Sequence, residues 1–105
     1  MAKSRKPYSN IWRPIAEADL DNIIDYIAQD SPANAKRFGK ELRDKTKQLA
    51  VLPGSGRSGR SGRPGLPGWL RELVAHKNYI IFYRVLDESR TVEILRVKHA
   101  AQQMP

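Results

Sequence analysis

Apolar residues recur at helical spacing through the first half of the chain. Four of them follow the i, i+3, i+4, i+7 pattern that places side chains on one helix face: Leu20, Ile23, Ile24 and Ile27. Pro14 suits the first helical position, because proline has no N–H to lose and its backbone is already set for a helix. The pattern predicts an amphipathic helix that starts at Pro14 and stops near Asp30.

A second helical pattern follows at once. Ser31 can cap this helix and Pro32 suits its first turn. The expected apolar stripe comprises Ala35, Phe38, Leu42, Leu49 and Leu52. The helix should run to about Val51, because the Pro53-Gly54 pair ends it. Two helices joined this tightly must fold back on each other as a hairpin.

The second half of the chain has the composition of β-strands. Residues 79–86 (YIIFYRVL) form the most apolar segment and predict a central strand buried on both faces. Residues 69–75 and 91–98 predict its antiparallel neighbours, and residues 8–12 can form a short extended segment before the first helix. The order β-α-α-β-β-β predicts an α+β fold in which the helical hairpin covers one sheet face and leaves the other open.

A connector rich in glycine separates the two halves. Between Pro53 and Gly68 lie six of the seven glycines and three of the seven prolines, with Ser-Gly-Arg written three times. That composition predicts neither helix nor strand across residues 54–68. An Arg/Gly nucleic-acid-binding segment is disfavoured, because residues 54–68 contain no aromatic side chain on which bases could stack.

Composition narrows the class of protein. The 105 residues fit one domain, with residues 1–9 expected to be flexible. The absence of cysteine excludes disulfides and thiolate-bound metals. No apolar run approaches the ~20 residues of a membrane span, and no apolar segment follows the basic start as in a secretory signal. We therefore expect a cytoplasmic protein with no membrane partner.

The net charge of +8 is unevenly distributed. Residues 1–30 carry four Lys/Arg against five Asp/Glu, whereas residues 31–105 carry fifteen against six. An excess of this size favours a polyanionic partner, which could be nucleic acid, an acidic protein segment or anionic lipid.

Motifs for cofactor or metal chemistry are missing from the sequence. His76 and His99 lie 23 positions apart without recognisable metal-ligand spacing, so no metal is expected. The glycine-rich stretch lacks the Gly-Lys-Ser/Thr ending of a phosphate loop, so no nucleotide cofactor is expected either. Asp21 and Asp25 lie one turn apart on a polar helix face, which favours a solvated pair over an acid/base pair.

The predicted strands carry a basic set comprising Arg71, Lys77, Arg84, Arg96, Lys98 and His99. Strict alternation puts Ile94, Arg96 and Lys98 on one face of the last strand and Leu95, Val97 and His99 on the other. A histidine beside arginines could cleave RNA, which needs a base, cations for the phosphorane and an acid. Spacing alone favours the simpler interpretation that His99 caps the core at a strand end.

Several segments, taken in order, resemble the RelE/ParE superfamily of bacterial toxins across about residues 10–103. The segments are Pro14–Leu20, Ile23–Ile27, Ser31-Pro32, Ala35–Phe38, Leu49–Pro53, Arg71–Val74, Asn78–Val85 and Val92–His99. The resemblance implies a toxin of a type II toxin–antitoxin module, with a helical hairpin on a curved antiparallel sheet. It also implies a cognate antitoxin as partner, with operator DNA bound only through the antitoxin complex.

The superfamily divides into RelE-like toxins, which cut mRNA on the ribosome, and ParE-like toxins, which poison DNA gyrase. RelE-type nucleases carry one arginine at the position of Ile80 and another at or near the position of Ala100, after the last strand. They also use a tyrosine in the C-terminal tail, and the tail of this chain has none. His99 occupies a position shared by both branches. The resemblance therefore favours the ParE-like branch, for which we assign no catalytic residue.

Two sets of site residues follow from these alternatives. A ParE-like toxin is expected to contact its target or antitoxin through Arg71, Arg84, Arg96, Lys98 and His99. If the protein is a nuclease, the catalytic candidates are His99, Arg71 and Arg96.

Relatives carry one Gly-Arg pair in this connector, so the triple repeat predicts a lengthened loop. Deleting one Ser-Gly-Arg unit should leave the melting temperature nearly unchanged, because each doubling of loop length costs only about 0.6 kcal/mol of closure entropy. Thermal unfolding measures this, and a large drop would mean that the loop is packed.

Overall fold

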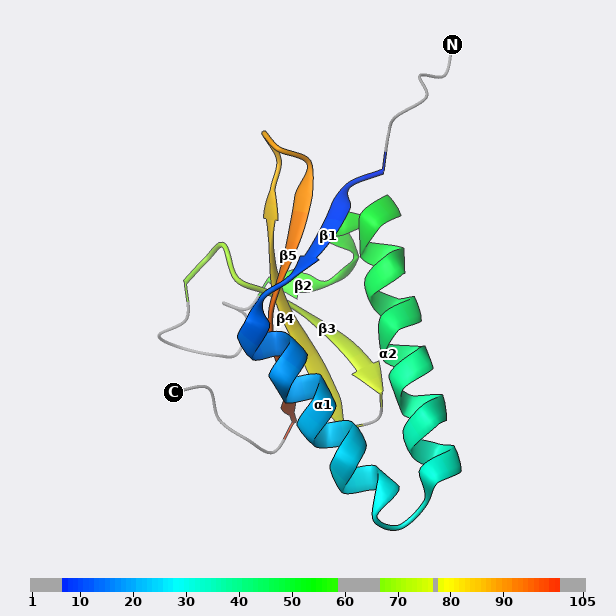
Figure 1. The fold of residues 1–105 in the computed structure, drawn as a ribbon. Helices are drawn as coiled ribbons and strands as arrows, with labels where there is room; N and C mark the ends of the chain where they lie inside the picture. The colour runs from blue at the N-terminus through cyan, green and yellow to red at the C-terminus, as the bar shows by residue number, and fades with distance from the viewer. Residues whose placement is uncertain (1–6, 59–66, 77, 101–105) are drawn as a thin grey trace.

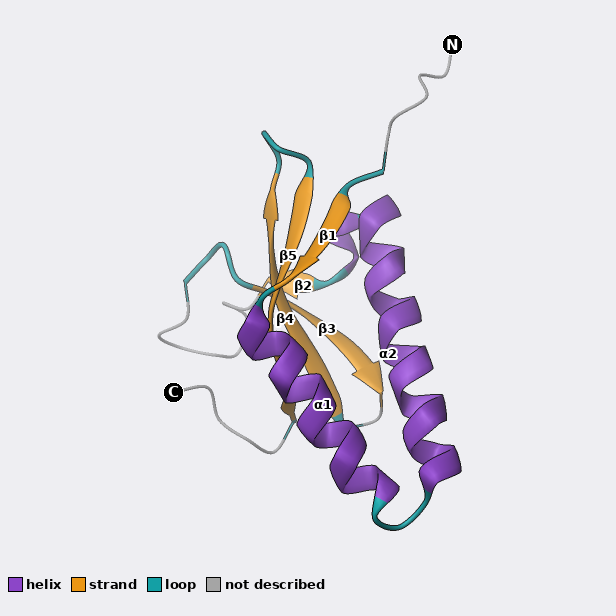
Figure 2. Ribbon diagram, in the orientation of Figure 1, coloured by secondary structure: helices purple, strands orange, loops and turns teal. Residues whose placement is uncertain are grey.

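In the part of the chain that the structure describes, two α-helices pack against one face of a five-stranded sheet (Figure 1). The computed structural model describes residues 7–58, 67–76 and 78–100. The elements are β1 (Ser9–Trp12), α1 (Pro14–Ala28), α2 (Pro32–Val51), the 3₁₀ helix η1 (Pro53–Ser55), β2 (Arg57–Ser58), β3 (Arg71–His76), β4 (Tyr79–Leu86) and β5 (Thr91–His99). The predicted helical hairpin on a sheet is confirmed, with helices and strands in separate layers (Figure 2).

The predicted antiparallel pairing of the last three strands is confirmed, and a parallel pair between β1 and β5 makes the sheet mixed. Its strand order is β1-β5-β4-β3-β2, and all neighbours are antiparallel except β1 and β5. β1 runs parallel to β5, with Ser9 opposite Thr91 and Trp12 opposite Ile94. A tight turn forces neighbouring strands to be antiparallel, whereas β1 and β5 are joined through the helices and the other strands and are free of that constraint.

Both helices start where the sequence predicts. Pro14 and Pro32 occupy first-turn positions, and the Ser31 hydroxyl accepts a hydrogen bond from the Asn34 N–H at 3.2 Å. The predicted stripe of α2 is wrong at its end, because Leu52 is 58% exposed. Its backbone has left the helical region (φ −126°, ψ 74°), and buried Thr46 takes part in the stripe instead.

The core lies between the helices and the sheet face that they cover, which we call the inner face. It consists of Ala16, Leu20, Phe38, Leu42, Leu49, Ala75, Ile81, Tyr83, Val92, Ile94 and Val97. The prediction of a central strand buried on both faces is confirmed for β4, where residues 80–83 are at most 5% exposed. The opposite face, which we call the outer face, was expected to be open. It instead holds a second buried cluster of Leu70, Ile80 and Phe82, with Leu95 packed against it.

A β-bulge in β5 overturns the predicted alternation. Phe82 is opposite Arg96, but Tyr83 is opposite Ile94, so Leu95 is an extra residue on β5. Ile94 therefore shares the inner face with Val97, and Leu95 packs on the outer face. The prediction reversed these two residues because one inserted residue shifts the period-two pattern.

The N-terminal segment is held closer to the fold than expected. The Tyr8 N–H donates to the Ala50 carbonyl at 2.8 Å, and the Tyr8 hydroxyl donates to Asp87 Oδ1 at 2.7 Å. Ser9 already belongs to β1. The expectation of flexibility over residues 1–9 therefore fails at Tyr8 and Ser9, and residues 1–6 lie outside the described part.

The start of the connector is structured, which corrects the prediction of neither helix nor strand. The Tyr83 hydroxyl accepts from the Gly56 N–H and donates to the Pro53 carbonyl, both at 2.9 Å. Arg71 Nη2 donates to the carbonyls of Gly54 (3.2 Å) and Gly56 (2.8 Å). These bonds draw the backbone onto the sheet edge, where β2 pairs with β3. The later Gly-Arg pairs, at residues 59–60 and 62–63, lie outside the described residues.

Gly56→Ala should destabilise the fold, because a Cβ there would lie 2.5 Å from both the Glu72 carbonyl and the Tyr83 hydroxyl. Overpacking of this kind costs about 1–3 kcal/mol. Gly54→Ala is the matched control, since its Cβ would meet Arg71 at an ordinary 3.8 Å. Urea unfolding compares the two, and equal midpoints would contradict the role of Gly56.

Candidate functional site

The carboxylate of Asp19 joins α1 to β5. Arg96 donates to it twice, from Nε to Oδ2 at 2.8 Å and from Nη2 to Oδ1 at 3.0 Å. The Val97 N–H also donates to Oδ2, at 2.9 Å. These side chains are only 14% (Asp19) and 24% (Arg96) exposed. Arg96, a predicted site residue, is therefore part of the framework that holds the site.

The bonds to Asp19 change the pKa of both partners. Burial by itself raises the pKa of Asp19, but the hydrogen bonds from Arg96 and Val97, together with the positive charges of Arg96 and Lys98, lower it overall. The hydrogen bond to Asp19 raises the pKa of Arg96 in turn. The pair is thus ionised at neutral pH and holds the helix against the strand.

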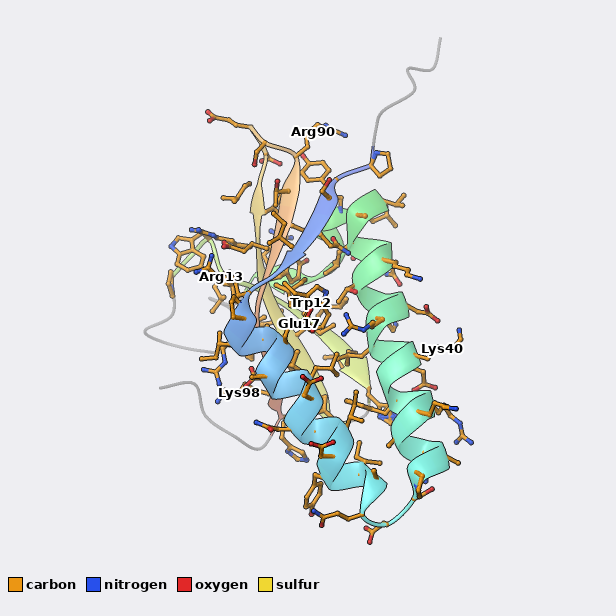
Figure 3. All side chains as sticks on the ribbon, viewed as in Figure 1. Trp12, Arg13, Glu17, Lys40, Arg90 and Lys98 are labelled. Atoms are coloured by element: carbon orange, nitrogen blue, oxygen red, sulfur yellow. The ribbon has the colours of Figure 1, made fainter. Side chains whose placement is uncertain are left out.

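A cleft of about 260 Å³ opens beside this pair, between α1 and the end of β5. The α1 side chains Asn22 and Tyr26 line one side, and Tyr79, Lys98 and His99 line the other. The ring of His99 meets that of Tyr79 edge-on, with centroids 5.1 Å apart. Burial, and then the neighbouring Tyr26, raise the pKa of Tyr79. Figure 3 shows Lys98 beside α1.

The cleft combines groups that could bind or react. His99 can exchange a proton, Lys98 is a cation and Tyr26, which is 69% exposed, offers a hydroxyl and a ring face. The His99 ring packs against Tyr79 beside the core and also lines the cleft, so both interpretations of His99 stay predictions. Sequence reasoning missed Asn22 and Tyr26, whose i, i+4 spacing was the available signal.

The other two predicted site residues lie away from this cleft. Arg71 is opposite Tyr83 in the sheet, and its guanidinium donates to the connector carbonyls of Gly54 and Gly56. Arg84 lies toward the end of β4, where its Nε donates to Glu93 Oε1 and its guanidinium lies 5.4 Å from the Trp69 ring centroid. The structure therefore brings together Arg96, Lys98 and His99 but not Arg71 or Arg84.

The helices form a further charged contact across their own groove. Arg43 Nη2 lies 3.2 Å from Glu17 Oε1, and the Arg43 guanidinium lies 5.0 Å from the Trp12 ring centroid. Figure 3 shows Trp12 and Glu17 between the two helices. Over the described ranges 7–58, 67–76 and 78–100, no cluster of three His, Asp or Glu residues suits a metal. None of the helices in these ranges is long and apolar enough to cross a membrane.

Comparison with known proteins agrees with this fold. The family described as "ParE toxin of type II toxin-antitoxin system, parDE" matches residues 11–104. The protein named Toxin RelE2 of Caulobacter vibrioides is 39% identical over 92 residues, which cover 88% of this chain and 94% of that protein.

Two solved structures share the fold. One is described as the chromosomal ParDE system from P. aeruginosa (26% identity, TM-score 0.69, covering 88% of this chain and 95% of that one). The other is the RelBE2 toxin–antitoxin complex from Mycobacterium tuberculosis (24% identity, TM-score 0.59, covering 96% and 100%). The chain belongs to the ParE toxin family, within the RelE/ParE superfamily of type II toxin–antitoxin toxins.

Asp19→Asn should lower the free energy of unfolding at about pH 7 by about 1.5–3 kcal/mol, the usual contribution of hydrogen bonds to a charged group. The pKa of Asp19 is lower in the folded protein than in the unfolded chain. The ionised carboxylate therefore stabilises the fold fully at pH values above its ordinary pKa, and this stabilisation is lost as the pH falls through the pKa of the folded state. The difference between wild type and variant should therefore shrink at about pH 3 in urea unfolding.

Asp21→Asn is the control for this measurement. Asp21 is exposed on the same helix and forms no ion pair in the described part of the chain. It should change stability little at either pH. A difference for Asp19→Asn that is equally large at both pH values would contradict the proposed ionisation.

Proposed function

We propose that this protein is a ParE-like toxin that arrests growth in the cytoplasm by binding and inhibiting DNA gyrase. A cognate antitoxin neutralises it, and operator DNA is bound only through the antitoxin complex. The observation that carries the proposal concerns Arg71 and Arg96, the two arginines that a nuclease would have available for catalysis. Both are engaged in holding the fold.

Cleavage of RNA needs cations that can approach the scissile phosphate. Arg96 gives two hydrogen bonds to Asp19, and Arg71 gives two to connector carbonyls. Moving either guanidinium to a phosphate would break these bonds. Both residues therefore suit a structural role better than the catalytic role expected of a nuclease.

The positions at which RelE-type nucleases carry arginine also support a binding protein. Ile80 is 5% exposed and packs against Leu70 and Phe82, where it can only contribute apolar contact. Ala100 is exposed and has no functional group. Without these cations, the protein is better suited to bind a target than to cleave one.

An RelE-like, ribosome-dependent mRNA endonuclease is the second candidate. It is favoured by the cleft in which His99, Lys98 and Tyr26 face one space, and by the name of the relative Toxin RelE2. In that case His99 would exchange the proton and Lys98 would face the phosphate.

The antitoxin is expected to be acidic or amphipathic where it contacts this chain. The net charge of +8 favours such a partner. The solved relatives include toxin–antitoxin complexes, which supports a cognate antitoxin for this chain as well.

A gyrase supercoiling assay run beside an in vitro translation assay tests the proposal. We expect the wild type to block supercoiling and to leave the message intact on primer extension. His99→Ala should still block supercoiling at excess toxin, because inhibition by binding needs no proton transfer; loss of the expected His99 contact should only raise the toxin concentration that is needed. Full supercoiling at excess toxin, with message cleavage that disappears in His99→Ala, would instead support the endonuclease.

A further inference from the structure

A charged cluster on the outer face lies apart from the cleft beside His99. It consists of Arg13, Trp69, Arg84 and Glu93, and we call it the Glu93 platform. Glu93 lies at its centre and is only 7% exposed. Both of its carboxylate oxygens are paired, Oε1 with Arg84 Nε and Oε2 with Arg13 Nη1 at 3.3 Å.

Strand register places this platform on the side away from the helices. Arg84 is opposite Glu93, and their neighbours Tyr83 and Val92 belong to the core between the helices and the sheet. Successive side chains of a strand point to opposite faces, so Arg84 and Glu93 point outward. Ile11 is opposite Glu93 on β1 and shares this outer face.

The buried carboxylate orients Arg84 for an outside ligand. The Nε–H of Arg84 donates to Glu93, and the guanidinium lies near the Trp69 ring. The two terminal amino groups of Arg84 have no hydrogen-bond partner among the described residues. A pair of parallel N–H groups is the arrangement that binds a carboxylate or phosphate through two bonds. Arg13, which is 54% exposed, adds a second cation at the same carboxylate.

Exposed apolar side chains accompany these cations. Ile11 and Ile15 are each 51% exposed, and Trp69 is 55% exposed. Ile11 pairs with Glu93 in register, and Ile15 follows Arg13 in the first turn of α1. Figure 3 shows Arg13 at the start of α1. Tryptophan and arginine are enriched among the residues that dominate protein–protein binding energy.

We propose that the Glu93 platform is the surface on which the toxin docks an acidic, partly apolar segment of DNA gyrase. The inference rests on the proposed function. Two arginines against one carboxylate leave the platform positive, so a partner carboxylate fits its charge. The isoleucines favour a protein segment over a nucleic-acid backbone, which offers no aliphatic contact in return.

Ile15→Glu tests the docking surface at a half-exposed position outside the buried core. An acidic residue in the first turn of a helix is favourable to the helix dipole, so the fold should be retained. The added charge would repel an acidic partner, and we expect the toxin concentration for half-inhibition of gyrase supercoiling to rise at least about tenfold. Val51→Glu, at a 69% exposed position at the end of α2, is the matched control and should inhibit like the wild type.

Two further variants separate the parts of the platform. Trp69→Ala removes the ring against which Arg84 lies, and Arg84→Lys keeps the charge but loses the paired donors. Both should weaken gyrase inhibition while complex formation with the co-expressed antitoxin stays near that of the wild type. The melting temperature should stay near that of the wild type for Trp69→Ala, whereas Arg84→Lys also loses the Nε bond to Glu93 and should lower it.

Each result decides the inference. Inhibition by Ile15→Glu at wild-type concentrations would overturn it, as would a selective loss of antitoxin binding, which would assign the platform to the antitoxin. Binding of a short labelled DNA duplex that is lost in Arg84→Lys would assign it to phosphate and also overturn the inference. If the wild type itself leaves supercoiling untouched, the proposed function fails, and the docking inference fails with it.

Discussion

The attachment of β5 to α1 through Asp19 is the interaction on which the rest of the molecule depends. β1 pairs with the edge of β5 only as far as Ile94, where the Arg13 N–H donates to the Ile94 carbonyl at 3.0 Å. Beyond that point the Asp19 carboxylate accepts the Val97 N–H and so continues the pairing with a side chain. A backbone donor left without a partner at this partly buried edge would cost about 1–3 kcal/mol.

The attachment of α1 to β5 also forms the cleft that is lined by the candidate functional side chains. The bulge at Leu95 turns Ile94 and Val97 toward the helices, and Asp19 holds α1 alongside the strand. Asn22 and Tyr26, one and two turns further along α1, therefore face Lys98 and His99. The cleft is thus a consequence of how the strand edge is completed.

Several arginines in the described part of the chain hold distant segments together. Arg71 holds the connector, Arg96 holds α1 and Arg84 shares the buried Glu93 with Arg13. The chain has no cysteine with which to form cross-links. Charge-assisted hydrogen bonds take over that task, and Arg84 combines it with donors that have no partner among the described residues. These cations, although similar in the sequence, therefore differ in the contacts that they make in the fold.

The sequence by itself determined the two helices, the three main strands and their order. Those features depend on local periodicity, on the Ser31 cap and on prolines at helix starts, all of which act within a few residues. The resemblance of short segments, from Pro14–Leu20 to Val92–His99, was also sufficient for the family. The candidate residues Lys98 and His99 were identified because a basic strand end stands out from its neighbours.

Only the tertiary structure decided which of these residues act together. Asp19 and Arg96 are 77 positions apart, and no local pattern pairs them. The Leu95 bulge exchanged the predicted faces of Ile94 and Leu95 in β5. The parallel pairing of β1 with β5 depended on how the two helices and the other strands are arranged between them. Gly56 became structural because the Tyr83 hydroxyl reaches its N–H across the sheet edge. Sequence periodicity reports the face of one element, whereas these contacts are fixed by the packing of several, so they could be found only in three dimensions.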